Sequence, residues 1–231
     1  MAALMRPHSL LAELQLLSLC SVRMGEVGAR SLAQAFRAGG GVSLVELYLG
    51  GCDLGEGAAA IADAMVVSGV PKLQLIELEK NRMGPVAGRA LARLLESGQA
   101  TQLVEFKVNG NSLGDQVGVL LAESLAASIS KGTPLQKLWL NSNELRDETC
   151  KAMAKALRQL DHRAPLSLVH LDGNYFSEAA CKVMAQALCD GAFPSGRYVG
   201  ISWPPGGESA EMVRQIRDVR PTILSIYAAL N

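Results

Sequence analysis

The residues best suited to chemistry in this chain are its three histidines and five cysteines. His170 is followed two residues later by Asp172. A strand would place both side chains on one face, as in a general base whose carboxylate orients the imidazole. A catalytic unit also needs a nucleophile, and the facing positions of the neighbouring segment hold Trp139 and Asn141. The sequence therefore predicts no catalytic residue.

The cysteines follow neither a metal-ligand pattern nor a disulfide pattern. They are odd in number, with no CxxC pair and no nearby histidine cluster. Cys150 and Cys181 hold equivalent places in two helical segments and are expected to be buried, whereas Cys20 is expected to be exposed. We therefore predict no metal, no cofactor and a reducing, cytoplasmic location, within a cytoskeletal, ciliary or other large assembly as one option. The cysteines are Cys20, Cys52, Cys150, Cys181 and Cys189.

Charge and hydropathy argue against two classes of partner. Lys+Arg and Asp+Glu number 22 each, so the chain lacks the basic excess of a typical nucleic-acid binder. No stretch approaches the ~18 continuous apolar residues of a membrane span. Hydrophobic residues make up 49% of the chain but aromatic residues only 4%, which favours many thin layers filled by Leu, Ala, Val and Met. We predict neither a nucleic-acid partner nor a membrane partner.

Six segments follow one template, L-x-x-L-x-L-x-x-(N/C)-x-(L/M/F). The L-x-L core alternates with period two and predicts a short strand with one buried face. The stretch after each core has apolar residues at helical spacing. In the first segment Leu11 or Leu16 could serve as a template leucine in place of Leu14, but the position of Met24-Gly25 favours a template that begins at Leu14. The segments begin at Leu14, Leu44, Leu73, Leu103, Leu135 and Leu166, at spacings of 30, 29, 30, 32 and 31 residues.

The ninth template position holds a residue that can bond backbone groups. An asparagine amide there can satisfy buried N–H and C=O groups of neighbouring turns where the chain leaves the strand. Val22 occupies this position in the first segment and cannot do so, which is typical of a terminal repeat. In GDQVGV the glycines are predicted to serve a turn and close helix packing. The predicted structural ladder comprises Cys52, Asn81, Asn111, Asn143 and Asn174.

These segments resemble the ribonuclease-inhibitor type of leucine-rich repeat, in which a repeat of roughly 28–29 residues holds a strand and a full helix. Similar arrays occur in NOD-like receptors, in the Ran GTPase-activating protein and in many cytosolic and ciliary proteins. The resemblance covers about residues 11–190. It implies an α/β leucine-rich-repeat solenoid, or horseshoe, with a parallel concave β-sheet, convex helices and about six repeats plus caps. Because many functions share this scaffold, the resemblance implies the fold more strongly than the activity.

Three divisions of the chain follow from the repeat. Residues 1–13 are expected to form an N-terminal cap, residues 14–190 six leucine-rich repeats, and residues 191–231 a C-terminal capping segment that seals the core. Within the last segment, Tyr198 to Trp203 has the strand pattern. A helix is expected from Ser209 as its N-cap. Residues 221–230 fit a strand or a helix.

Outward side chains of stacked strands should form columns across the sheet. One column would hold Ser18, Tyr48, Glu77, Lys107, Trp139, His170 and Ser202; a second Leu16, Glu46, Leu75, Glu105, Lys137, Leu168 and Gly200; a third Cys20, Gly50, Glu79, Asn109, Asn141 and Asp172. A partner with a basic stretch and an apolar anchor would complement these columns. The predicted partner-binding residues are Tyr48, Glu77, Glu79, Glu105, Lys107, Lys137, Trp139, His170 and Asp172.

Trp139 is the most distinctive residue of these columns. An outward tryptophan supplies a large apolar area at low entropic cost and is enriched at binding hot spots. The alternative is that Trp139 only packs on the stems of Lys107 and Lys137, with a cation–π contact and no partner. Both interpretations place it on the face that a partner would meet.

The sequence thus favours a non-enzymatic protein–protein interaction module, acting as an adaptor or as a structural subunit of a larger assembly. Binding is expected through the concave sheet face, with no small-molecule substrate. One alternative is a regulator of a small GTPase of the activating type, with Arg23, Arg82 and Arg146 on the edge after the strands. The other is a ligand-sensing fragment of a NOD-like receptor.

Overall fold

A computed structural model describes residues 12–203, 207–221 and 223, without the side chains of residues 207–210. In this part of the chain, strands and helices alternate, and the strands form one parallel sheet in chain order. The strands are β1 (Leu16–Ser18), β2 (Glu46–Tyr48), β3 (Leu75–Glu77), β4 (Glu105–Lys107), β5 (Lys137–Trp139), β6 (Leu168–His170) and β7 (Tyr198–Gly200).

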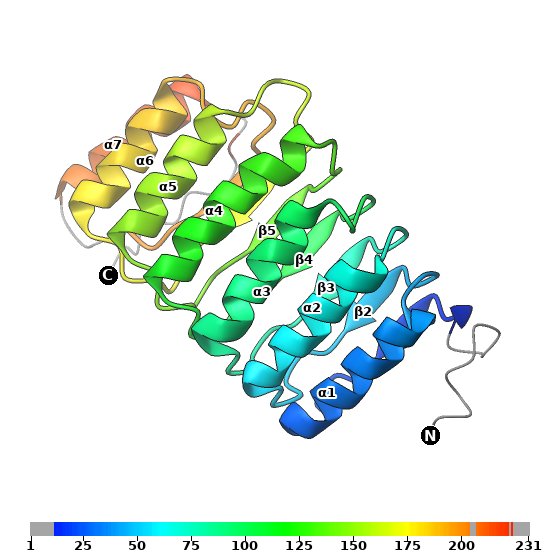
Figure 1. The fold of residues 1–231 in the computed structure, drawn as a ribbon. Helices are drawn as coiled ribbons and strands as arrows, with labels where there is room; N and C mark the ends of the chain where they lie inside the picture. Colours follow the sequence, from blue (N-terminus) through cyan, green and yellow to red (C-terminus); the bar gives the residue numbers. More distant parts are fainter. Residues whose placement is uncertain (1–11, 204–206, 222, 224–231) are drawn as a thin grey trace.

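The helices form a second layer that covers one face of the sheet (Figure 1). Short turns precede or extend two of them: η3 (Phe36–Gly40) is π-helical and η4 (Gly55–Gly57) is a 3₁₀ turn. The helices are α1 (Gly25–Ala35), α2 (Ala58–Ser68), α3 (Gly84–Ser97), α4 (Asp115–Ser130), α5 (Asp147–Arg158), α6 (Glu178–Cys189) and α7 (Gly207–Val219).

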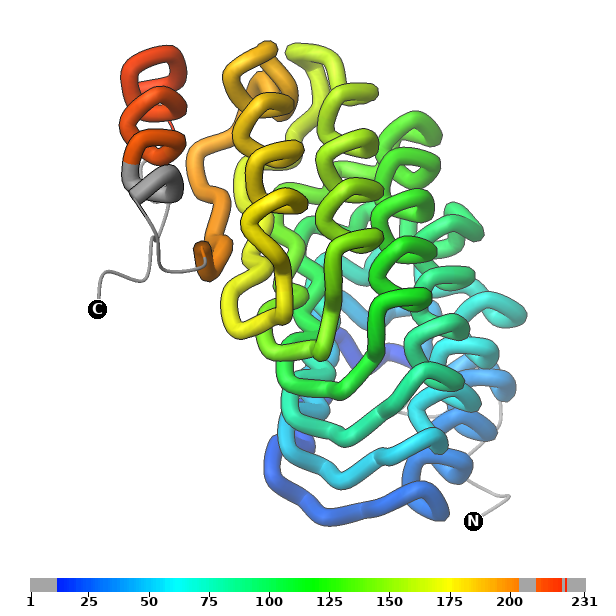
Figure 2. Tube along the Cα trace, turned by 90° about the vertical axis from the view of Figure 1, so that its left-hand side faces the viewer, coloured from blue at the N-terminus to red at the C-terminus, as the bar shows by residue number. Residues whose placement is uncertain are grey.

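Successive repeats stack as turns of one coil (Figure 2). Neighbouring strands lie ~4.8 Å apart and neighbouring helices ~8–10 Å apart, so the helical side needs more room and the sheet forms the inner, concave side. This confirms the expected α/β leucine-rich-repeat solenoid. The pairing of Leu16 with Glu46 also confirms Leu14 as the start of the first template.

The template leucines build the core. Leu44, Leu47 and Leu49 are fully buried in the second repeat, and their equivalents are buried in the repeats that follow. In the first repeat the equivalent Leu14, Leu17 and Leu19 are only partly buried. The core therefore runs continuously from α1 to α7 and is less enclosed at β1.

Asparagine side chains connect the turns after the strands. Asn81 Nδ2 donates to the carbonyl oxygens of Leu49 and Leu78 at 2.7 and 3.0 Å, and Asn81 Oδ1 accepts from the N–H of Cys52 at 2.8 Å. Asn111 and Asn143 repeat the pattern, and Asn174 Oδ1 accepts from the N–H of Asn143 at 2.8 Å. Each amide thus bonds its own turn and the preceding turn, so the repeats are linked along the array.

The C-terminal part differs from expectation in two places. Helix α7 begins at Gly207, so the prediction of Ser209 as its N-cap is wrong. β6 pairs Leu168 with Tyr198 and His170 with Gly200, so the predicted last members of two columns, Gly200 and Ser202, are wrong by two residues. Residues 1–11 of the predicted N-terminal cap, and residues 224–230 of the segment predicted as a strand or helix, lie outside the described residues.

Aspartates of one repeat cap the helix of the next. Asp115 Oδ1 accepts from the N–H groups of Arg146 and Thr149 at 2.8 and 3.0 Å and from the Thr149 hydroxyl at 2.6 Å, at the start of α5. Asp147 accepts in the same way from the N–H and hydroxyl of Ser177 at 2.7 and 2.6 Å, at the start of α6. These bonds satisfy N–H groups that a helix leaves free at its first turn.

We expect Asp115→Ala to lower the free energy of unfolding by about 1–2 kcal/mol, as for other lost helix caps. Burial raises the pKa of Asp115, but hydrogen bonds from Thr149 and from backbone N–H groups outweigh it and hold the pKa below its usual value. A carboxyl with a lowered folded pKa contributes stability above its unfolded pKa, about 3.9, and loses that contribution as pH falls through the folded value.

Urea unfolding of both proteins at several pH values tests this prediction. The difference between wild type and Asp115→Ala should be constant near neutral pH and shrink below about pH 4. Glu123→Ala, at an exposed position of the same helix α4, is the matched control and should stay within about 0.5 kcal/mol of wild type. If the free energies of unfolding of wild type and Asp115→Ala differed as much at about pH 2.5 as at neutral pH, the ionised carboxylate would have no role.

Candidate functional site

The strand register brings the outward side chains into rows on the sheet face that the helices leave open. One row runs from Tyr48 through Glu77, Lys107 and Trp139 to His170. We call this face the concave surface and define it by Glu46, Tyr48, Glu77, Glu79, Glu105, Lys107, Lys137, Trp139, His170, Asp172 and Tyr198. Seven of the nine predicted binding residues lie on strands β2 to β6, and the other two, Glu79 and Asp172, lie two residues beyond the ends of β3 and β6.

Ion pairs occupy the middle of the concave surface. Lys107 Nζ lies 3.3 Å from Glu77 Oε2 and 3.3 Å from Glu105 Oε1, and Lys137 Nζ lies 3.2 Å from Glu105 Oε2. The side chains of Glu105 and Lys107 are only 13% and 24% exposed, so solvent screens their pair less than a surface ion pair. Glu105 is therefore the centre of the network, since it contacts both lysines.

The network keeps its central groups ionised. Burial raises the pKa of Glu105, but the hydrogen bond from Lys137 and the charge of Lys107 outweigh it and lower the pKa below its usual value. For Lys107 burial lowers the pKa, and the carboxylates of Glu105 and Glu77 reverse this and raise it. At neutral pH the pair thus carries full opposite charges.

Further carboxylates lie on the β2 and β3 side. Tyr48 donates its hydroxyl to Glu46 Oε2 at 2.8 Å, and this bond, together with burial and nearby carboxylates, raises the pKa of Tyr48 to about 12. Glu79 accepts from Asn109 Nδ2 at 3.2 Å and lies 3.7 Å from the largely exposed ammonium of Lys80. This part of the surface is acidic and polar.

Trp139 is held in place by its neighbours. Its indole N–H donates to Glu105 Oε1 at 3.0 Å, and Lys107 Nζ lies 5.8 Å from its ring centroid. The His170 ring contacts it edge-to-face at 5.2 Å, and Tyr198 contacts His170 in turn at 5.4 Å. The side chain remains half-buried, so part of a positioned aromatic residue is accessible to solvent.

Among the described side chains, His170 is not paired with a nucleophile. His170 Nε2 lies 2.6 Å from Asp172 Oδ2, while Ser202 Oγ lies 3.4 Å from Asp172 Oδ1 and accepts from the N–H of Gly173 at 2.9 Å. The serine therefore contacts the carboxylate and not the imidazole, which is the reverse of a serine–histidine base unit. Within the described ranges, no three His, Cys, Asp or Glu side chains converge as metal ligands.

No protein-family model matches the chain. It is 31% identical to NACHT, LRR and PYD domains-containing protein 12 of Mus musculus over 134 residues, which are 58% of this chain and 12% of that protein. It is 32% identical to the ribonuclease inhibitor of Sus scrofa over 120 residues, 52% of this chain and 25% of that protein. The Ran GTPase-activating protein 2 of Caenorhabditis elegans is 31% identical over 109 residues, 44% of this chain and 11% of that protein.

The chain is a distant homologue of leucine-rich-repeat proteins of the ribonuclease-inhibitor type. The matches span between 11% and 25% of the relatives' own lengths. They therefore concern the repeat array, and repeat domains of this type are typical protein-binding modules. Among the described helices, none combines the length and apolar composition that a membrane crossing requires.

One aromatic residue of this leucine-rich-repeat surface was missed by the sequence-based columns. Tyr198 occupies the outward position that the predicted column gives to Gly200, because the predicted alignment of the last strand is two residues too late. Val199 and Ile201 are buried at 1% and 0% exposure, and they match the buried Val169 of β6 and the buried Leu171 that directly follows β6. Aligning these two pairs would have placed Tyr198 beside Leu168.

The edge arginines of the repeat domain are solvent-exposed. Arg82 forms a long pair with Asp53, at 3.6 Å between two exposed side chains, and the Arg146 guanidinium lies 5.8 Å from the Tyr175 ring centroid. Arg23 is also exposed. Arg146 and Tyr175 line an open hollow of about 520 Å³ whose other lining residues include the carboxylates of Asp147 and Glu148.

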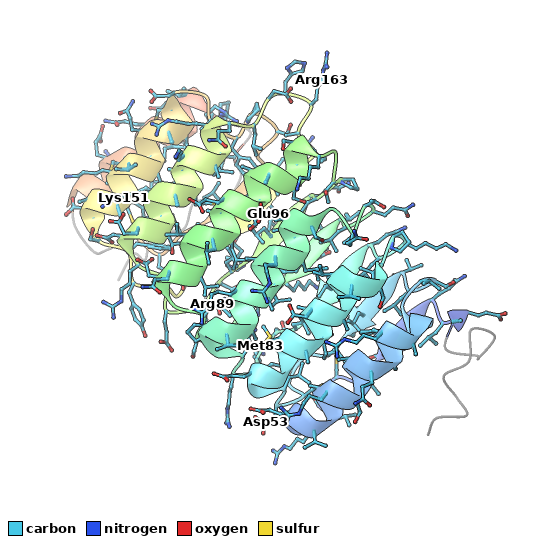
Figure 3. The ribbon with its side chains drawn as sticks, viewed as in Figure 1. Asp53, Met83, Arg89, Glu96, Lys151 and Arg163 are labelled. Atoms are coloured by element: carbon cyan, nitrogen blue, oxygen red, sulfur yellow. The ribbon has the colours of Figure 1, made fainter. Side chains whose placement is uncertain are left out.

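The helical side carries scattered charges and a broad hollow. Figure 3 shows Arg89, Glu96 and Lys151 on α3 and α5, and Arg163 on the loop that follows α5. A hollow of about 840 Å³ lies between the C-terminal halves of α4 and α5. Its floor is formed by small apolar side chains such as Ala126, Ala152 and Ala156, and its rim has charges of both signs.

The buried cysteines serve as core residues. Cys150 and Cys181 are buried as predicted, and burial raises the pKa of both thiols, that of Cys181 to about 12. Thiols that remain protonated are poor nucleophiles and poor metal ligands. Cys20 is exposed, as expected, and none of the five cysteines is joined to another.

Proposed function

We propose that this protein is a non-enzymatic protein–protein interaction module that binds its partner through the concave surface. The observation that carries the proposal is Trp139, half-buried and fixed by Glu105, Lys107 and His170 on the open sheet face. An aromatic side chain that is already ordered loses little entropy on binding, which is typical of binding hot spots.

The partner is a protein, and the role is that of an adaptor or of a structural subunit in a larger assembly. The relatives support this because repeat arrays of this type present one extended face to a protein ligand. The five unpaired cysteines support a reducing compartment, and we propose the cytoplasm. The contacts of His170 and the pKa of the buried thiols support the absence of catalysis.

Co-purification from the native source, followed by mass spectrometry, tests the proposal. Trp139→Ala removes the aromatic edge and is expected to lose the partners that wild type recovers, by about tenfold or more. Arg89→Ala, on the exposed face of α3, is the matched control and should recover them all. Circular dichroism must show wild-type folding for both variants. Partners lost with Arg89→Ala but kept with Trp139→Ala would contradict binding at the concave surface.

A second candidate is regulation of a small GTPase. Two observations favour it: the similarity to the Ran GTPase-activating protein 2 of Caenorhabditis elegans, and the exposed Arg82 and Arg146 on the edge after the strands. Stimulation of GTP hydrolysis by a panel of small GTPases, lost in Arg82→Ala or Arg146→Ala, would establish this function. An unchanged hydrolysis rate across the panel would exclude activation of those GTPases. A ligand-sensing fragment of a NOD-like receptor would use the same surface, and is favoured only by the similarity to the mouse protein.

A further inference from the structure

The concave surface has two chemically different halves. Carboxylates gather over β2 to β4, where Glu46, Glu77, Glu79 and Glu105 lie on or directly after the strands. Aromatic rings gather over β5 to β7, where Trp139, His170 and Tyr198 contact one another in a row and the one carboxylate of the defined surface in this half, Asp172, bonds His170 at 2.6 Å. A ligand that covers the whole surface therefore meets a change from acidic to aromatic along the array.

The acidic half carries a local excess of charge in a chain that is neutral overall. Lys107 and Lys137 are the lysines in the outward rows of the described strands, and both already pair with Glu77 or Glu105. Glu46 receives only the neutral hydroxyl of Tyr48 among the contacts on this surface. The cation nearest to Glu79 is Lys80, at 3.7 Å, with 74% of its side chain exposed. A pair of that kind contributes little stability, so a cation of a partner can displace Lys80 from Glu79 at small cost.

We propose that the concave surface binds a basic segment of the partner protein that also carries an apolar or aromatic anchor. The basic residues lie over β2 to β4, against Glu46 and Glu79, and the anchor lies over β5 and β6, against Trp139 and Leu168. This inference rests on the proposed function and names the chemistry of its partner. Charge complementarity orients the segment, and the aromatic half holds it.

The spacing of the strands sets the spacing within the segment. Trp139 lies two strands from Glu77 and Glu79 and three strands from Glu46 and Tyr48. At ~4.8 Å per strand the distance across the sheet is about 10–14 Å. An extended chain that advances ~3.4 Å per residue covers this in roughly three or four residues. The partner segment therefore has lysine or arginine three or four residues from its anchor.

Selection from a random 12-residue peptide library, displayed on phage and presented to the full chain, tests the inference. Enriched peptides should contain the predicted spacing of basic residue and anchor, and fluorescein-labelled copies give their affinities. Glu46→Gln with Glu79→Gln removes two charges without changing side-chain shape. It should weaken binding about tenfold and flatten its salt dependence, since fewer charge contacts are screened. Trp139→Ala should weaken binding at least as much, and Arg89→Ala should leave it unchanged.

The outcomes separate the inference from the proposed function. Two results would overturn the basic segment and leave binding at the concave surface standing. One is enrichment of peptides without basic residues. The other is a peptide affinity that the double glutamine variant does not change but Trp139→Ala abolishes. Peptides that bind every concave variant as wild type would oppose both. A library without enriched peptides would overturn a linear segment as ligand, while the co-purification experiment would still decide the proposed function.

Discussion

Replacing Asn111 with alanine is expected to lower the free energy of unfolding by about 2–4 kcal/mol. The Asn111 side chain is fully buried, and its Oδ1 accepts the N–H of Asn81 at 2.7 Å. Among the described residues that N–H has no other acceptor, so alanine leaves it buried and unpaired. The carbonyls of Leu78 and Val108 lose a donor as well, but each keeps a second donor, from Asn81 and Asn143 respectively.

The unpaired N–H of Asn81, and not the lost bonds to carbonyl groups, should therefore dominate the loss of stability in Asn111→Ala.

Cys52 shows, within the same protein, how a turn of this kind is satisfied without an asparagine. A cysteine at this position offers no carbonyl-type acceptor, but Val22, in the turn before it, directs its N–H to the carbonyl of Leu19 at 3.0 Å. The first turn is thus satisfied without an asparagine. We expect Asn111→Cys to be nearly as destabilising as Asn111→Ala, although Cys52 is tolerated in its own repeat.

Urea unfolding followed by circular dichroism measures these differences. Asn109→Ala is the matched control, because Asn109 lies in the same turn, is only half-buried and donates one side-chain bond, to Glu79 at 3.2 Å. It should cost less than about 1 kcal/mol. If Asn111→Cys were as stable as wild type, the acceptor role of the ladder asparagines would be wrong.

The repeat template determines the fold and most of the register, because leucine spacing and strand alternation are both local properties of the sequence. The register of the last strand is not determined by these local properties. Val199, Ile201 and Trp203 are all buried, so two alignments of the strand satisfy the same alternation. A shift of two residues keeps every side chain on its own face, so polarity does not distinguish the alignments. Only pairing with β6 decides between them.

Contacts between side chains of different repeats are a second feature that the template does not predict. The template places Glu105, Lys107 and Lys137 on one face, but it does not say which lysine bonds which oxygen, because rotamers decide that. It also gives no indication that Asp115 caps the helix of the following repeat, since the two groups are about 30 residues apart in the chain and meet only through stacking. The columns of a surface are therefore predictable from the sequence, whereas its pairing is not.

The second large effect is expected at Gly118, in helix α4. Alanine is favoured over glycine inside a helix by roughly 0.5–1 kcal/mol, so propensity alone predicts that Gly118→Ala stabilises. A Cβ at this position, however, would lie 2.6 Å from Thr149 Cγ2 and 2.8 Å from Leu145 Cδ2, and closer still to Thr149 Oγ1. The added methyl group must push Thr149 away from Asp115, which it bonds at the start of α5.

We therefore expect Gly118→Ala to be destabilised by about 1–3 kcal/mol, the usual range for an overpacked core. A double-mutant cycle identifies the cause. Thr149→Ala removes the atoms that the new methyl group meets most closely, so Gly118→Ala should cost clearly less in that background, although Leu145 prevents full recovery. Gln116→Ala, at an exposed position of the same helix turn, serves as control and should be neutral or slightly stabilising. Additive costs in the cycle would show that close packing against Thr149 is not why α4 needs glycine here.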